Sequence, residues 1–584
     1  IQMAATPKAA SAPHAARSGN LDLMRPVMSA RAARAMAGAV HESQRFFVEI
    51  IKPSHYDDDG YVIQWQRAFV PSNSLACLYA LVQEVAQRRL LGDNVTIEPR
   101  VYDESHTVIP VKQIIARIRA GGNRGVVFLA GVQTNQFPRA ADLAAEFREA
   151  DIPVVIGGFH VSGCLAMLPE MPLELKKVQE MGVTLFAGEA EGRMASLLDD
   201  VYGGRLQPVY NYLGDLPNLQ GCPTPQLPRD VAARSMFFVP FDAGRGCPFA
   251  CSFCTIINVQ GRRSRFRHAD DIEQVVRTNL QQGIRRFFIT DDNMARNKNW
   301  EPIFDRLIAL REKEGARLKL IIQVDTLSHK IPGFIEKAAR AGCNRIFIGL
   351  ENINPENLRA ANKRQNCVDD YREMLQAWRA YHVLTHAGYI LGLPDDTPES
   401  IERDIRIIQQ ELPIDILEFM ILTPLPGSAD HKALCEQGVR LDPDLNKYDV
   451  EHVVAPHERM TAEQWQEVYH RVWHLYYSPE HVETLLRRAR VNGAGMRHLS
   501  AAILAYYGSF RFEGLHPLQC GLLRRKVRAT RRPGLPRENP FLFYPRQVWE
   551  TVSTWTGIGL YHLELERIRR RLQKDPSAAE YTDR

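Results

Sequence analysis

The chain has 584 residues, of which 45% are hydrophobic and 24% charged, an ordinary globular composition with enough length for about two to four domains. Its 73 basic and 68 acidic residues leave a formal charge of only +5, which gives no reason to expect nucleic acid or anionic lipid as a partner. No apolar run approaches the roughly 18–20 residues that span a bilayer. We therefore expect a soluble, cytoplasmic protein.

The first 44 residues are rich in Ala, Arg, Ser and Pro and show no sustained apolar period. This composition predicts a disordered tail. Ordered structure is expected to begin at about residue 45.

Residues 45–205 alternate helix-like and strand-like segments, a pattern that predicts a parallel, doubly wound sheet. The ligand of such a fold lies beyond the carboxyl ends of the strands, where this sequence has the loops 131–136, 157–160 and 188–192. Residues 206–234, with repeated Pro and Gly, are expected to form a linker. The expected elements are a helix over 75–91, a strand over 96–102, a helix over 111–120, a strand over 125–130, a helix over 140–149 and a strand over 153–157.

A second alternating run over 235–440 predicts an incomplete (βα) barrel, whose chemistry would lie at the carboxyl ends of its strands. Residues 441–584 are expected to be mainly helical. The fold class expected for the whole chain is thus α/β. The six barrel strands are expected near 236–241, 286–290, 319–324, 345–350, 386–391 and 417–422.

Three of the ten cysteines, Cys247, Cys251 and Cys254, follow the first barrel strand in the spacing C-x3-C-x2-C. The preceding Gly-Arg-Gly lets the chain turn sharply, so that three thiolates can converge. Structural zinc and ordinary ferredoxin clusters take four protein ligands, and no fourth cysteine lies nearby. The pattern favours a [4Fe-4S] cluster with one open iron over zinc or incidental thiols.

This motif, with the aromatic Phe253 before its last cysteine, resembles that of the radical SAM superfamily. The resemblance implies that the open iron binds S-adenosylmethionine and that its reductive cleavage gives a 5′-deoxyadenosyl radical. By position, residues at the ends of later strands resemble those that bind S-adenosylmethionine, although any barrel also places loop caps there. These residues are Asp291, Asp292, Gln323, Asp325, Glu351 and Gly392, together with Phe253.

The loops of the first domain resemble those of the cobalamin-binding domain that precedes many radical SAM barrels. One departure is the absence of a D-x-H-x-x-G segment, so a histidine is not expected to ligate cobalt from below. His160 either contacts the corrinoid or caps a turn, and a domain that has lost its corrinoid is the alternative. The residues that the resemblance assigns to cobalamin are Gln133, Thr134, Asn135, Gly157, Gly158, His160, Gly188, Glu189 and Glu191.

The resemblance implies a cobalamin-dependent methyltransferase that acts on an unactivated carbon of a small-molecule substrate. An oxidative cyclase, like the anaerobic magnesium-protoporphyrin ester cyclase of the same family, is the first alternative, and a non-catalytic iron-sulfur or corrinoid carrier is the second. An electron donor such as flavodoxin or ferredoxin is expected. The catalytic residues and the substrate are not predicted. A basic run over residues 524–532 can suit RNA, but a solvated face is favoured, so nucleic acid is not an expected partner.

Overall fold

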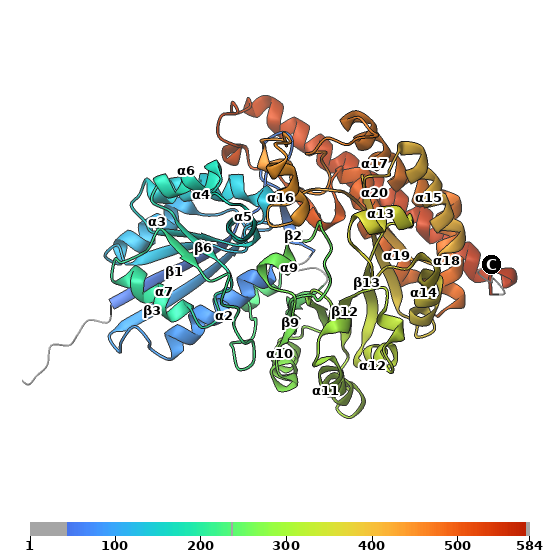
Figure 1. Cartoon of the computed structure of the whole chain (residues 1–584), viewed down its shortest axis with the longest axis horizontal. Coiled ribbons are helices and arrows are strands. Elements are labelled where there is room, and N and C mark those ends of the chain that lie inside the picture. The colour runs from blue at the N-terminus through green and yellow to red at the C-terminus, as the bar shows by residue number, and fades with distance from the viewer. Residues whose placement is uncertain (1–43, 70, 235–237, 494, 580–584) are drawn as a thin grey trace, which may run out of the picture. The chain divides into compact units, whose positions relative to one another are not determined.

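The computed structural model describes residues 44–69, 71–234, 238–493 and 495–579. The predicted tail therefore lies outside the described residues, except for Gln44, which already begins a strand. The chain divides into two units, Ile1–Ser43 and Gln44–Arg584, and everything below concerns the second (Figure 1).

The first sheet is parallel and has six strands in the order β3-β1-β4-β5-β6-β7. Its strands are buried on both faces: Val126 and Phe128 of β4 pack into one hydrophobic cluster, and Val127 and Leu129 into another. Helices cover both clusters, which confirms the predicted doubly wound fold. The strands are β1 (Gln44–Lys52), β3 (Val95–Asp103), β4 (Gly125–Leu129), β5 (Val154–Gly157), β6 (Thr184–Ala187) and β7 (Val209–Asn211).

The sequence pattern missed three of these strands, β1, β6 and β7. The last of them lies in the segment expected to be a linker, so that segment contributes an edge strand before it leaves the sheet. Helices α2 and α7 cover one face of the sheet, and α3 to α6 lie on the other. The helices are α2 (Asn73–Gln87), α3 (Val111–Ala120), α4 (Phe137–Arg148), α5 (Phe159–Met167), α6 (Leu173–Glu180), α7 (Met194–Tyr202) and α8 (Arg229–Ala232).

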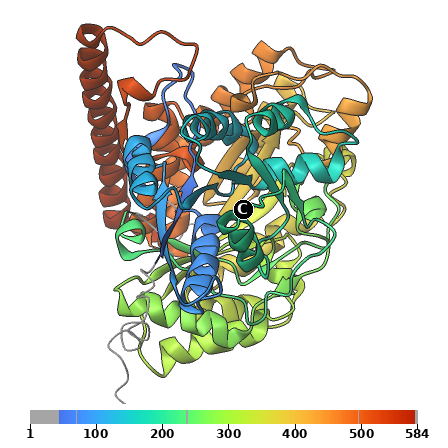
Figure 2. The ribbon, with the colours of Figure 1, turned by 90° about the vertical axis from the view of Figure 1, so that its left-hand side faces the viewer.

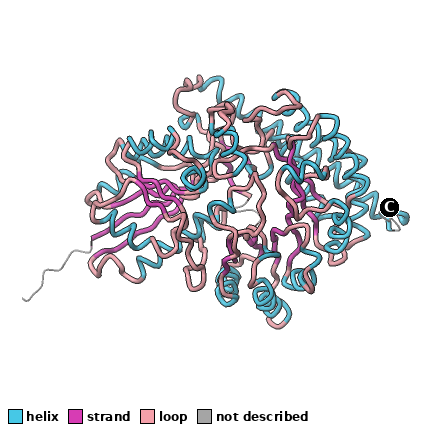
Figure 3. The backbone as a smooth tube through the Cα atoms, in the orientation of Figure 1, coloured by secondary structure: helices cyan, strands magenta, loops and turns pink. Residues whose placement is uncertain are grey.

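The second sheet is also parallel, and its six strands follow chain order from β8 to β15. Figure 3 shows the strands of the two sheets as separate groups, each with helices outside it. This sheet is the predicted incomplete barrel. Its strands are β8 (Val239–Phe241), β11 (Arg286–Ile289), β12 (Lys319–Val324), β13 (Cys343–Glu351), β14 (Leu384–Leu391) and β15 (Ile416–Ile421), and its helices are α10 (Ala269–Gln281), α11 (Trp300–Glu312), α12 (Phe334–Ala341), α13 (Pro355–Ala360), α14 (Tyr371–Arg379), α15 (Pro398–Glu411) and α16 (Ala429–Glu436).

The C-terminal region is mainly helical, as predicted, and shares one hydrophobic core with the barrel. Phe419 of β15, for example, packs edge-on against Trp473 and Tyr476. Figure 2 shows the last helix as a long rod along one side of the ribbon. No helix in the described part of the chain is long and apolar enough to cross a membrane. The helices are α17 (Ala462–Tyr476), α18 (Pro479–Val491), α19 (Met496–Glu513) and α20 (Pro540–Lys574).

The basic run near residue 524 is only in part the solvated face that the sequence predicted, because Arg525 is exposed whereas its two neighbours are not. It forms strand β16 (Gly521–Arg525), which pairs antiparallel with β2 (Gln64–Ala68), and the turn after it. Arg524 and Lys526 are largely buried and contact Asp57. These two cations therefore form ion pairs that stabilise the fold, because buried charges require partners.

Candidate functional site

The cysteine motif lies on a loop just after the first barrel strand. Strand β9 (Gly244–Arg245) pairs antiparallel with β10 (Arg265–Phe266), and the chain turns at Gly246, whose φ is +91°. A Cβ there would lie 2.4 Å from the carbonyl oxygen of Arg263, so a glycine is required at the turn. The short helix α9 (Ile256–Val259) closes the loop.

Two predicted ligand-binding acids hold this loop in place. The Oδ1 of Asp291 accepts hydrogen bonds from the backbone N–H groups of Ala243 and Gly244, both at 2.7 Å. Asp292 accepts one from the N–H of Gly246, also at 2.7 Å. Burial raises the pKa of Asp291 to about 7 and that of Asp292 to about 6. Both carboxyl groups thus position the start of the cysteine loop.

The three thiols lie in partly or wholly buried positions. Burial raises the pKa of Cys247, and it raises that of Cys254 to about 12, so without a cation both are neutral thiols. Among the described residues, the three sulfur atoms do not form a group with all members within 4.8 Å of one another.

The other residues predicted for S-adenosylmethionine end the neighbouring strands. Gln323 Nε2 donates to the carbonyl oxygen of Asp291 at 3.1 Å. Asp325 is held by Arg296 and by Asn293 Nδ2, the latter at 2.8 Å. Thr290 Oγ1 and Asn293 Oδ1 are buried and lack a hydrogen-bond partner in the described structure. Buried polar atoms of this kind are suited to receive a ligand.

Glu351 has a left-handed backbone with φ +66°, an unusual conformation that is costly for a residue with a side chain. Its carboxylate forms a buried ion pair with Lys363. The ammonium group of Lys363 also lies 5.7 Å from the ring centroid of Phe253, on the cysteine loop. The structure thus brings Glu351 and Phe253 together through Lys363. Gly392 lies on the next strand end, where its N–H donates to Asp396 at 2.8 Å.

The segment 361–366 was missed by the sequence reading. Asn362 Nδ2 donates to the carbonyl oxygen of Ala250 at 2.8 Å, and Gln365 Nε2 lies 3.5 Å from Cys251 Sγ. A donor beside a ligating sulfur is a common way to tune an iron-sulfur cluster. The signal available in the sequence was the polar run Asn362 to Asn366, but it follows a helix and not a strand.

The first sheet has a cavity of about 170 Å³ beyond the carboxyl ends of β4, β5 and β6. Gly157, Gly158, Gly188, Glu189 and Glu191, which the resemblance assigned to cobalamin, all line it. A Cβ on Gly158, whose φ is +146°, would lie 2.1 Å from the backbone nitrogen of Val132, so only glycine fits there. The other lining groups include Asn73, Cys77, Leu81, Phe128, Phe186, Met194, Leu197, Arg245 and Val259.

The remaining residues assigned to cobalamin do not line this cavity. Gln133 is exposed, while Thr134 and Asn135 are buried in the turn Thr134–Gln136. His160 is fully buried, with Nδ1 3.3 Å from Thr134 Oγ1. Its Nε2 lies 3.7 Å from Glu174 Oε1 and 4.0 Å from the sulfur of Cys164. His160 therefore faces the helices behind the loop.

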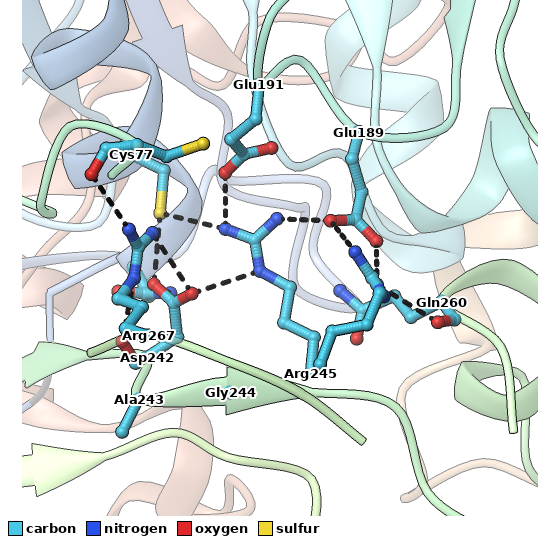
Figure 4. A network of polar contacts seen from close by, with 12 residues as sticks. Cys77, Glu189, Glu191, Asp242, Ala243, Gly244, Arg245, Gln260 and Arg267 are labelled. Atoms are coloured by element: carbon cyan, nitrogen blue, oxygen red, sulfur yellow. Dashed lines mark hydrogen bonds and ion pairs between the residues drawn. The ribbon is translucent and has the colours of Figure 1, made fainter. Parts of the chain in front are cut away.

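A buried polar network joins the front cavity to the cysteine loop (Figure 4). Arg245, two residues before Cys247, forms ion pairs of 2.6 Å with both Glu189 and Glu191 and one of 3.1 Å with Asp242. Glu189 also pairs with Arg265, and Asp242 pairs with Arg267. The two glutamates predicted as cobalamin contacts thus reach across to the barrel.

These residues fit the implied cofactors. The donor set of three cysteine thiols on one loop suits a cluster with one open iron. The buried strand-end atoms without a hydrogen-bond partner in the described structure, Thr290 Oγ1 and Asn293 Oδ1, suit the binding of S-adenosylmethionine. The glycine-lined, largely apolar cavity of the front domain suits part of a corrinoid, because backbone can approach a flat ring where no side chain intervenes.

Residues 243–408 match the radical SAM superfamily. The chain is 27% identical over 345 residues to bacteriochlorophyllide d C-8(2)-methyltransferase of Chlorobaculum tepidum, covering 56% of this chain and 72% of that protein. It is 27% identical over 365 residues to hopanoid C-2 methylase of Rhodopseudomonas palustris, and this match covers 62% of this chain and 65% of that protein.

Among solved structures, the cobalamin-dependent S-adenosylmethionine radical enzyme OxsB with aqua-cobalamin bound matches with a TM-score of 0.55. The two sequences are 13% identical, and the match covers 93% of this chain and 82% of that one. At this identity the likeness shows a shared fold.

Proposed function

Because the chain belongs to the radical SAM superfamily, we propose that it is a cobalamin-dependent methyltransferase that acts on an unactivated carbon. When bound, the cluster and S-adenosylmethionine would supply an adenosyl radical, and cobalamin would supply a transferable methyl group. Cys247, Cys251 and Cys254 would hold the cluster, and the strand-end polar residues would hold S-adenosylmethionine.

The observation that carries this proposal is the bridge between the front cavity and the cysteine loop. Arg245 pairs with two carboxylates that line the cavity and stands two residues before the first cysteine. A methyl carrier and a radical source can act on one carbon only if both are held close to it. A carrier domain that only stored corrinoid would not require this fixed connection.

The residues of the chain have distinct parts in this proposal. Asp291 and Asp292 position the cysteine loop, and Gln365 lies against the sulfur of Cys251, which would be a cluster ligand. Lys363, close to Phe253 and Glu351, would orient the polar groups of S-adenosylmethionine. The cavity lined by Gly157 and Gly158 would receive part of the corrinoid.

The test is anaerobic reconstitution with iron, sulfide and hydroxocobalamin, followed by reduction in the presence of S-adenosylmethionine. A methyltransferase of this type gives both 5′-deoxyadenosine and S-adenosylhomocysteine, and corrinoid stays with the protein through gel filtration. Formation of 5′-deoxyadenosine alone, with corrinoid retained, would favour the oxidative cyclase. Neither product would be expected from a non-catalytic carrier, and that result would contradict the proposal.

A further inference from the structure

The interior of the barrel contains a cavity of about 710 Å³ that the predicted cofactor residues do not account for. It lies between the inner face of strands β11 to β15 and helix α19. One predicted residue, Gln323, lines it. The other lining residues are Phe69, Phe238, Arg286, Phe288, Lys319, Ile321, Asn344, Arg345, Phe347, His386, Glu418, Met420, His498, Ala501, Ala502, Ala505, Tyr506, Pro517 and Leu518.

The walls of this cavity are mainly apolar. Phe288 and Phe347 project from neighbouring parts of the sheet, and Tyr506 faces them from α19. The three alanines of α19 leave room where larger side chains would fill the barrel. Ligand sites are commonly apolar cavities of this size with a few placed polar groups, so the space suits an apolar molecule.

Three cations lie at the end of the cavity where strands β11, β12 and β13 begin: Arg286, Lys319 and Arg345. Arg286 and Lys319 are partners in register on neighbouring parallel strands, and both residues are exposed at this end of the cavity. None of the three forms an ion pair with a carboxylate among the residues that the structure describes. Arg345 is half-buried and lies against the rings of Phe238 and Tyr506. Together with the two exposed cations it makes this end of the cavity positive, which favours an anion there.

The neighbouring titratable groups do not cancel this positive charge. Burial, together with Lys319, Arg345 and Arg286, lowers the pKa of His498 to about 4, so that histidine is neutral at pH 7. Glu418 is fully buried, and one of its oxygens lies 3.1 Å from His386 Nε2. One carboxylate against three cations leaves the cavity positive.

The cavity runs from these cations toward the predicted S-adenosylmethionine site. Gln323 lies four residues along β12 from Lys319, a rise of about 13 Å in a strand. Its side chain reaches the carbonyl oxygen of Asp291, at the strand end that faces the cysteine loop. A ligand with its anion at Lys319 would extend its other end toward the radical source.

We propose that this cavity binds the substrate, and that the substrate is an apolar molecule with an anionic group held by Arg286, Lys319 and Arg345. The substrate assignment rests on the proposed function, whereas the binding site does not. The reacting carbon would lie at the opposite end of the molecule, near Gln323.

The test compares two fluorescent probes with the same apolar body, 1-anilinonaphthalene-8-sulfonate and the uncharged N-phenyl-1-naphthylamine. The anionic probe should bind the full-length protein about three- to tenfold more tightly, as expected for charge-assisted contacts with cations at the exposed end of the cavity. Lys319→Gln and Arg286→Gln should each weaken the anionic probe about three- to tenfold and leave the neutral probe unchanged. Arg285→Gln, one residue outside the cavity lining, is the matched control and should change neither.

A filling variant shows whether the probes occupy this cavity. Ala505→Phe places a ring into the space from α19, so it should reduce the binding of both probes. Displacement of the anionic probe by decanoate and by decyl phosphate, with decanol as the neutral control, then distinguishes a carboxylate from a phosphate. Equal affinities for the two probes, or no effect of Lys319→Gln and Arg286→Gln, would overturn the proposal.

These binding measurements need neither the cluster nor turnover, so they separate the two proposals. If the wild type forms no 5′-deoxyadenosine, the proposed function is rejected, whereas the proposal of an anion-binding cavity is unaffected. Retained 5′-deoxyadenosine formation with no preference for the anionic probe would reject only the substrate class.

Discussion

Replacing Arg245 with Gln should remove the ion pairs that connect the front domain to the cysteine loop. Arg245 is 10% exposed at its side chain and pairs with three carboxylates. Glu189 retains Arg265 and Asp242 retains Arg267 in the variant. Glu191, 3% exposed at its side chain, has no second ion pair in the described structure, so one buried carboxylate loses its partner.

The expected loss of unfolding free energy follows from the ion pairs that each variant removes. Removing one partner of a buried ion pair destabilises a protein by about 3–5 kcal/mol, because it leaves an uncompensated charge. Arg245→Gln should lie in this range. Glu191→Gln leaves Arg245 with two other carboxylates, so it should cost only about 1–2 kcal/mol. In the double variant no orphaned Glu191 charge remains, and the two changes should couple by about 2 kcal/mol.

The assay is equilibrium urea unfolding of the wild type, both single variants and the double variant at one protein concentration. Arg306→Gln is the control, because Arg306 is 52% exposed and pairs with Asp270 at the surface, where an ion pair contributes less than about 1 kcal/mol. A loss of less than 1 kcal/mol in Arg245→Gln, or strict additivity in the double variant, would refute the reasoning about the bridge.

Three further predictions concern separate parts of the chain. Gly158→Ala should abolish corrinoid retention in gel filtration without changing iron content, because its methyl group would overlap the backbone of the preceding loop. Gly214→Ala is the control: its methyl group would meet no atom within 4 Å, so this variant should retain corrinoid in the same assay. Lys363→Met should lower the rate of 5′-deoxyadenosine formation about ten- to a hundredfold with a normal cluster spectrum, and an unchanged rate would exclude its proposed part in orienting S-adenosylmethionine. His452 lies between two carboxylates that raise its pKa from 6.5 to about 10 against the effect of burial, so its stabilisation is complete below pH 6.5 and is lost as pH rises toward 10. His452→Gln should therefore cost more unfolding free energy at pH 6 than at pH 9.5, and an equal cost at both would show that this histidine is not protonated in the fold.

The architecture of both sheets could be predicted because period and composition are local properties. Strand β12 was predicted over the same residues, 319–324, that the structure gives it. The strand β7 was missed because it has three residues among prolines and glycines, and its position at the sheet edge is a tertiary effect. The strand β1 follows directly after the low-complexity tail, where no turn signal marks its start.

The candidate site was predictable where the chemistry is held in one segment and not where it is assembled from distant ones. The three cysteines lie within eight residues, so their spacing alone indicates a cluster. Lys363 and Gln365 come into the site only because a loop after α13 folds back over the cysteine loop. The pairing of Arg245 with Glu189 joins residues 56 positions apart, and no local pattern predicts it.

The formation of 5′-deoxyadenosine tests the central claim most directly. The wild type, Cys251→Ala and Cys343→Ala, a change at a buried core cysteine away from the motif, would each be reconstituted with iron and sulfide, reduced, and given S-adenosylmethionine. We predict 5′-deoxyadenosine from the wild type and from Cys343→Ala and none from Cys251→Ala. Continued cleavage in Cys251→Ala, or no cleavage in the wild type with a full complement of iron, would contradict the assignment of the cysteine loop.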